Sequence, residues 1–220
     1  MAYLTVVQEV MVWVLPVLFA VTVHEVAHGW VANLRGDSTA LMMGRLTLNP
    51  LKHIDIVGTV IVPISCLVLG GFVFGWAKPV PVSWRNLRKP RQDAALVAVA
   101  GPLSNLLMAL LWAFIAKMGV MLFQQGFSSA LFLAYMGNAG ISINLMLMIL
   151  NLLPIPPLDG SRVVSSLLPP RLSRSYDLIE PYGLMILVAL IFTNILSMIL
   201  NPPLQWMQIG ILRLFGLFGL

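Results

Sequence analysis

The stretch VWVLPVLFAVTVHEVAHGWVANL, residues 12–34, decides the fold of this chain. Apart from Glu25, it contains no acidic or basic residue other than two histidines. At 1.5 Å per residue, a helix over residues 10–34 is roughly 37 Å long, enough to cross about 30 Å of hydrocarbon with some tilt. Ionisable side chains are costly at membrane depth, so His24, Glu25 and His28 indicate a functional site.

The composition also indicates a membrane protein. Of the 220 residues, 59% are hydrophobic and 10% are charged, against about 25% charged in soluble domains. Such a chain cannot cover a water-facing surface, so we predict one all-α polytopic membrane domain over residues 1–220, with about four to six transmembrane segments. The net charge of +5 does not indicate a nucleic-acid partner, because the basic residues cluster in loops between apolar runs.

Four clear spans are expected, over residues 10–34, 94–116, 129–153 and 183–200. A small β-like or re-entrant element is expected between the first two spans. Residues 44–48 alternate like a short strand, whereas residues 57–76 are apolar but interrupted by proline and glycine. Residues 203–220 form either a further span or an interfacial helix.

His24 and His28 have the i, i+4 spacing that places two imidazoles on one face of a helix. This HExxH spacing suits two nitrogen ligands of one tetrahedral Zn²⁺, with Glu25 as general base on a zinc-bound water. The alternative is two core histidines that happen to lie four residues apart. A glutamate between them in a membrane span argues against that interpretation.

A catalytic zinc needs a third protein ligand, and Asp159 is the strongest candidate. It follows a helix that three prolines break, in NLLPIPPLDG. Unwound backbone at membrane depth is buried in protein or lines a cavity. An ordinary exit loop with a solvated aspartate is the alternative. The remaining candidates are Asp37, Asp55, Asp93, Asp177, Glu180 and His53.

Membrane topology tests this assignment. Asp159 can meet the histidines only if an even number of full crossings separates them, so we expect residues 57–76 to enter the membrane and return. Most basic residues then lie on one side, with Lys117 nearly alone on the other. By the positive-inside rule the basic side, and the site near it, are cytoplasmic. The basic run over residues 78–91 is then a membrane-proximal loop, with a specific lipid or partner site as the alternative.

Three motifs together, HEVAHGW, AGPLSNL and NLLPIPPLDGSR, resemble the site-2 protease family of intramembrane zinc metalloproteases. GRLTLNPLKHID and GWAKPVPV are similar to the compact bacterial branch without a PDZ domain. The resemblance implies specific roles for the site residues. Zinc would be bound by His24, His28 and Asp159, with Glu25 as base and with Asn151 and Asn105 at the substrate.

Two residues need separate comment. The family motif commonly reads LDGGR, and this chain has Ser161 at the second glycine, a small residue that should cost little. His53 is either a group beside the site or an interfacial histidine, since a fourth protein ligand would close the position that catalysis needs.

The predicted function is hydrolysis of peptide bonds within or near transmembrane segments of other membrane proteins. It would use one Zn²⁺ per chain, in the cytoplasmic (inner) membrane of a bacterium. Residues 40–48 are a candidate edge for an extended substrate. A membrane metal transporter and a non-catalytic membrane scaffold are the alternatives.

Overall fold

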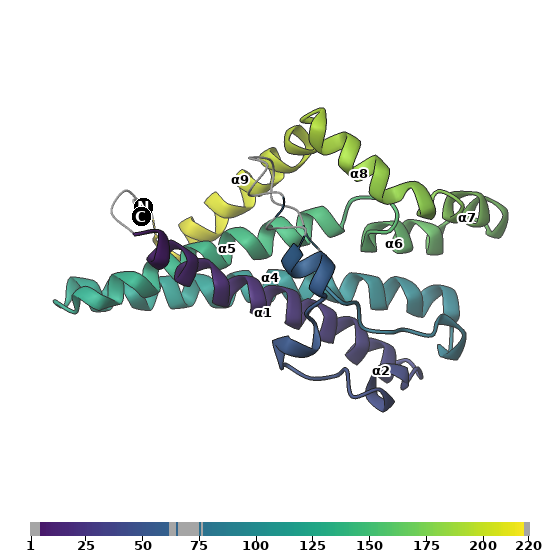
Figure 1. Ribbon diagram of the computed structural model, residues 1–220, viewed down its shortest axis with the longest axis horizontal. Helices are drawn as coiled ribbons and strands as arrows, with labels where there is room; N and C mark the ends of the chain where they lie inside the picture. The colour runs from purple at the N-terminus through teal and green to yellow at the C-terminus, as the bar shows by residue number, and fades with distance from the viewer. Residues whose placement is uncertain (1–4, 62–64, 66–74, 76, 218–220) are drawn as a thin grey trace.

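The computed structural model describes residues 5–61, 65, 75 and 77–217. This part of the chain is helical and contains no strand (Figure 1). Three long helices pack together: α1 (Val6–Leu34), α4 (Pro90–Gln124) and α5 (Leu131–Asn151). In the view of Figure 1, α8 (Gly183–Phe192) and α9 (Ile195–Phe215) form an inverted V over α5.

Shorter elements connect the long helices. In Figure 1, α2 (Thr39–Met42), α6 (Asp159–Leu167) and α7 (Pro170–Asp177) lie at the right-hand end of the molecule. The segment Ile56–Ile61 is a π-helix, η2. The single turns are η1 (Pro50–Lys52), η3 (Trp84–Asn86), η4 (Ser128–Ala130) and η5 (Glu180–Tyr182).

Four segments of the described chain are long and apolar enough to cross a membrane. This finding confirms the expected all-α membrane class. The segments are Val7–Leu34, Pro90–Gln124, Ser128–Asn151 and Pro170–Phe192.

The structure departs from the expected single span over residues 183–200. Helix α8 ends at Phe192, Asn194 adopts a φ of 58°, and α9 begins at Ile195. A left-handed residue interrupts the helical hydrogen-bond pattern, and asparagine tolerates that conformation better than most residues. Apolar composition alone does not show such a break. Residues 195–215 instead belong to one helix, with Pro202 and Pro203 inside it.

The β-like element expected over residues 44–48 is wrong, because no strand forms there. The Arg45 N–H donates to Ala40 O in α2, and the Arg45 guanidinium donates to Lys78 O. Alternation alone does not make a strand, since a strand needs a partner. The re-entrant segment expected over residues 57–76 lies mostly outside the described residues and stays a prediction.

Small residues allow α4 and α5 to approach closely. A Cβ atom on Gly137 would lie 2.6 Å from Ala116 N, and one on Gly140 would meet the Trp112 ring. Ile141 and Leu145 on α5 are fully buried in the same core. The hairpin of α4 and α5 therefore forms the platform on which α1 packs.

Candidate metal centre

His24, His28 and Asp159 come together where α1 faces the start of α6. Asp159 Oδ2 lies 3.2 Å from His24 Nε2 and 3.3 Å from His28 Nε2. The two Nε2 atoms are 3.0 Å apart. We call these three residues the metal cluster. The two histidines lie on one face of α1 because they are four residues apart. Asp159 lies 131 residues after His28 in the sequence (159 − 28).

The spacing of the three atoms fits one metal ion. Ligands about 2.0–2.1 Å from a tetrahedral zinc lie roughly 3.3–3.4 Å from one another. Asp159 Oδ2 is buried and has no conventional hydrogen-bond partner. A buried carboxylate oxygen facing two imidazole nitrogens is a donor set that zinc accepts.

Two oxygen atoms orient the histidine rings. His24 Nδ1 lies 2.6 Å from Asn105 Oδ1, and His28 Nδ1 lies 2.7 Å from the carbonyl oxygen of Val97. Both oxygens are acceptors, so each Nδ1 carries the proton and each Nε2 presents its lone pair to the cluster. Two lone pairs 3.0 Å apart repel each other unless a cation lies between them. In metal-binding histidines generally, a hydrogen bond from the ring nitrogen that does not bind the metal fixes the tautomer.

Asn105 is held by its own hydrogen bonds on α4. It is fully buried, and its Nδ2 donates to Ala20 O on α1 and to Asn144 Oδ1 on α5. Asn144 Nδ2 in turn donates to Gly140 O. All hydrogen-bonding atoms of the Asn105 side chain are therefore engaged within the protein. The structure joins Asn105 to His24, and the contact with substrate implied by the family resemblance stays a prediction.

Gly101 makes room for both imidazole rings. A Cβ atom at this position would lie 2.6 Å from Cε1 of His24 and 2.6 Å from Cε1 of His28. Any side chain at position 101 would displace the rings. This explains the glycine of the AGPLSNL motif in physical terms. Sequence reasoning named the motif but missed this residue and Val97.

Asp159 is positioned by the turn that precedes α6. A Cβ atom on Gly160 would lie 2.5 Å from the carbonyl oxygen of Leu153, so the start of α6 packs directly on the end of α5. Ser161 Oγ donates to Leu158 O at 2.6 Å, which satisfies the hydroxyl group inside the turn.

Glu25 lies beside the metal cluster and is held by a backbone group. Its Oε2 accepts a hydrogen bond from the Val80 N–H at 2.8 Å. Val80 is buried, and its side chain packs against Gly29, where an added Cβ would lie 2.7 Å from Val80 Cγ1. Gly29 lies one helical turn after Glu25, so the same face of α1 receives the whole contact. Sequence reasoning placed Val80 in a basic, membrane-proximal loop and in the GWAKPVPV motif, without a contact to Glu25.

The other candidate ligands lie elsewhere. The Asp37 carboxylate accepts from Ser83 N and Asn86 Nδ2, Asp93 accepts from Lys89 N, and Glu180 pairs with Arg162. Asp55 Oδ1 accepts from Gly58 N. In the described residues, the metal cluster is the one group of three such side chains close enough to share an ion.

Neither His53 nor Asn151 is hydrogen-bonded to the metal cluster in the part of the chain that the structure describes. His53 is buried, with Nε2 2.9 Å from Thr47 O, within its own loop. Asn151 is half-buried at the end of α5, and its Nδ2 donates to Leu147 O. A role for His53 beside the site and a role for Asn151 at the substrate both stay predictions.

Helices that can cross a membrane and a His–His–Asp cluster next to a glutamate define a membrane-embedded metallopeptidase architecture. Comparison with known families agrees with it. The sequence profile of peptidase family M50 matches residues 12–137 and 117–193, a stretch that includes the whole metal cluster. The chain belongs to peptidase family M50, the site-2 protease family of zinc metalloproteases.

Bacterial relatives support this membership. The chain is 40% identical over 209 residues to YwhC of Bacillus subtilis, which is named as a candidate zinc metalloprotease, over 92% of this chain and 90% of that protein. It is 30% identical over 181 residues to Rip2 of Mycolicibacterium smegmatis, which is also named as a candidate zinc metalloprotease. That match covers 82% of this chain and 66% of Rip2. No solved structure matches the chain.

Proposed function

We propose that this protein is an intramembrane endopeptidase that cleaves peptide bonds within or near transmembrane segments of other membrane proteins, with one zinc ion per chain. The observation that carries the proposal is the metal cluster beside Glu25 on a helix apolar enough to cross a membrane. Membership of family M50 supports proteins as the substrate class.

His24, His28 and Asp159 would hold the zinc ion. Bound zinc lowers the pKa of a coordinated water towards about 7 and polarises a carbonyl group. Three protein ligands leave the fourth position open for such chemistry. The two Nδ1–H groups donate to Val97 O and Asn105 Oδ1, and these hydrogen bonds support the arrangement because they turn both Nε2 atoms towards Asp159.

Glu25 would act as the general base. It directly follows His24 on α1, so its carboxylate emerges beside the metal ligands rather than among them. The Val80 N–H holds Oε2, and Oε1 has no hydrogen bond within the described residues. Oε1 is therefore the atom that would take a proton from the attacking water and return it to the leaving amine.

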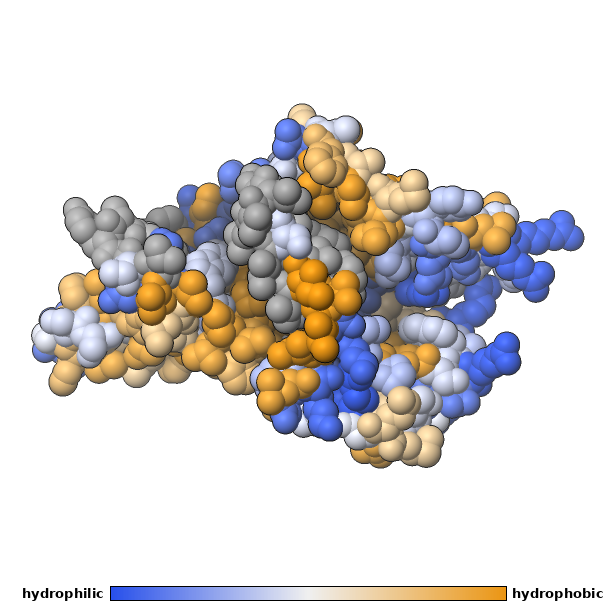
Figure 2. Space-filling model, viewed as in Figure 1, coloured by the Kyte–Doolittle hydropathy of each residue, from blue (hydrophilic) through white to orange (hydrophobic). Residues whose placement is uncertain are grey.

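We place the site towards the cytoplasmic side of a bacterial inner membrane. Hydrophilic surface gathers at the right-hand end of the molecule in Figure 2, the end that carries α2, α6 and α7. Lys117 lies at the other end, where the Cβ position of Gly216 is 3.5 Å from Lys117 Nζ. An excess of basic residues on one side favours a cytoplasmic location for that side. The named relatives are bacterial.

The proposal is tested by measuring how fast the Glu25→Gln variant cleaves a membrane-protein substrate, compared with wild type. The substrate is a purified membrane protein with one transmembrane segment, mixed with the full chain in detergent. Glutamine has nearly the shape of glutamate but cannot accept the proton, so cleavage should fall by about 10²-fold or more. The zinc content should be unchanged.

Cleavage by Glu25→Gln at the wild-type rate would contradict the proposed chemistry. Zinc uptake into proteoliposomes by both proteins, without cleavage by either, would instead support the metal transporter. Transport requires ligands along a path open to both faces, whereas the described residues hold one compact cluster.

A further inference from the structure

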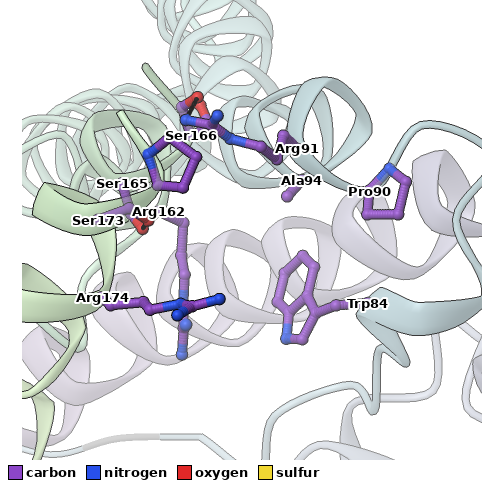
Figure 3. Close-up of a pocket in the computed structure, with 10 residues that line it drawn as sticks. Trp84, Pro90, Arg91, Ala94, Arg162, Ser165, Ser166, Ser173 and Arg174 are labelled. Carbon is purple, nitrogen blue, oxygen red and sulfur yellow. Dashed lines mark hydrogen bonds between the residues drawn. The ribbon is translucent and has the colours of Figure 1, made fainter. Parts of the chain in front are cut away.

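A cavity separate from the metal cluster lies between the start of α4 and the helices α6 and α7 (Figure 3). It has a volume of about 280 Å³. We call it the basic cavity, because three arginines line it and no carboxylate does. Its polar and aromatic lining includes Arg91, Arg162, Arg174, Trp84, Ser165 and Ser173.

The positive charges of the basic cavity are only partly neutralised. Arg162 pairs with Glu180, and its guanidinium carbon lies 5.6 Å from the centre of the Trp84 ring. Arg91 donates to backbone carbonyl oxygens at the end of α6, which carry no net charge. The Arg174 guanidinium has no ion pair or hydrogen bond within the described residues. Three cations facing one carboxylate leave an excess of positive charge in one cavity, which favours an anionic ligand.

The basic cavity lies nearer the start of α4 than the residue that contacts the metal cluster. Arg91 lies six residues before Val97 on α4 (97 − 91). The carbonyl oxygen of Val97 contacts His28. That separation corresponds to about 9 Å along the helix. If the metal cluster lies just inside the hydrocarbon, the basic cavity is at the level of the lipid headgroups.

The helices that form the cavity expose apolar side chains next to their basic ones. Leu167 at the end of α6 is 77% exposed, and Leu172 on α7 is 56% exposed. Short amphipathic helices that carry basic residues and exposed leucines are typical of the membrane interface. Acyl chains are then available beside the cavity, as well as headgroups.

We propose that the basic cavity binds the phosphate group of an anionic phospholipid. Guanidinium groups form paired hydrogen bonds with phosphate oxygens, and serine hydroxyls add further donors. Anionic lipids and tryptophan side chains are both typical of this level of a membrane. The exposed leucines favour a lipid over a soluble phosphate as the source of this group.

The bound headgroup would connect α4 and α6, the two helices that hold residues of the metal cluster and its hydrogen-bond partners. Arg91 belongs to α4, which carries Val97 and Asn105, whereas Arg162 and Ser165 belong to α6, which begins at Asp159. A phosphate held by both helices stabilises the position of Asp159 relative to the two histidines. The binding itself does not depend on the proposed proteolysis.

Two arginine variants on one helix test the proposal. Arg174 and Arg171 are both exposed residues of α7, but Arg171 does not line the cavity. Full-length wild type, Arg174→Gln and Arg171→Gln are purified in a neutral detergent. Each is incubated with phosphatidylglycerol or phosphatidylcholine, with and without excess inorganic phosphate. Native mass spectrometry counts the bound lipid, and thermal unfolding checks the fold.

Wild type and Arg171→Gln should retain phosphatidylglycerol in preference to phosphatidylcholine. Arg174→Gln should bind phosphatidylglycerol about tenfold more weakly, the effect of losing one charged hydrogen-bonding group. Equal losses in the two variants would show diffuse surface charge and would overturn the site. Equal retention of both lipids would overturn the preference for an anionic headgroup. Binding of inorganic phosphate with no retention of phosphatidylglycerol would overturn the lipid as the source.

Discussion

The orientation of two imidazole rings is the residue-scale feature on which the site depends. The i, i+4 spacing of His24 and His28 predicted a shared helix face, and the structure brings their Nε2 atoms to 3.0 Å. The atoms that orient the rings could not be predicted in the same way. Val97 O is a backbone atom with no side-chain signal, and its partner His28 lies 69 residues away.

Gly101 should be essential for metal binding, because a methyl group there would collide with both rings. We expect Gly101→Ala to lose most of its zinc, since misplaced ligands typically weaken metal affinity about 10–100-fold. The measurement is the ratio of zinc to protein after purification.

Gly210→Ala is the matched control for this substitution. Gly210 lies in α9, and a Cβ atom there has no neighbour within 4 Å. This variant should keep its zinc. Full zinc content in Gly101→Ala would show that the two rings tolerate displacement and would refute the steric argument.

At the scale of elements, the segment over residues 77–83 fastens the active-site face of α1. The Lys78 N–H donates to His53 O, the Val80 N–H to the Glu25 carboxylate, and the Ser83 N–H to the Asp37 carboxylate. Pro79 and Pro81 between them have no N–H group. The prolines were visible in the sequence, but the partners of the remaining donors lie on other elements.

Removing the Val80 N–H should impair catalysis without releasing the metal. Val80→Pro deletes the donor to Glu25, and a hydrogen bond to a charged group contributes about 1.5–3 kcal/mol. If that bond positions the base, kcat should fall about tenfold or more. The measurements are kcat for a transmembrane substrate and zinc content.

Val82→Pro is the control, because the Val82 N–H makes no hydrogen bond in the described part of the chain. It should lose less activity than Val80→Pro. If the two variants are equally impaired, general rigidity of the loop matters, and the single contact with Glu25 does not.

Asp37 connects the end of α1 to η3 and should make stability depend on pH. It is fully buried, which favours the neutral form, but hydrogen bonds from Thr39, Asn86 and Ser83 outweigh burial and lower its pKa. Because the pKa is lower in the folded state, the stabilisation is present above the unfolded pKa. It is lost as the pH falls through the folded value, below 3.8.

Asp37→Asn should therefore be less stable than wild type at neutral pH, by about 1–3 kcal/mol, since Ser83 N loses its acceptor. Thermal unfolding in detergent, repeated from neutral pH to below pH 4, measures the difference. The gap between the two proteins should narrow in acid. A gap that stays constant would show that the ionised carboxylate is not the source of the stabilisation.

For the whole molecule, hydrophobic composition was sufficient to predict an all-α membrane class, because the bilayer restricts spanning segments to helices or closed barrels. The break at Asn194 and the absence of a strand over residues 44–48 were not predictable. One depends on a single left-handed residue, and the other on a partner strand that the described chain does not supply. The proximity of Asp159 to the histidines depends on how α6 packs against α4, which local sequence does not encode.

Zinc content is the most direct test of the central claim, that three distant side chains share one metal ion. Full-length wild type, Glu25→Gln and Asp159→Ala should be purified in parallel with limiting zinc. We predict one zinc ion per chain in wild type and in Glu25→Gln, and a large loss in Asp159→Ala. Equal zinc in all three proteins, or none in wild type after zinc is supplied, would contradict the proposed site.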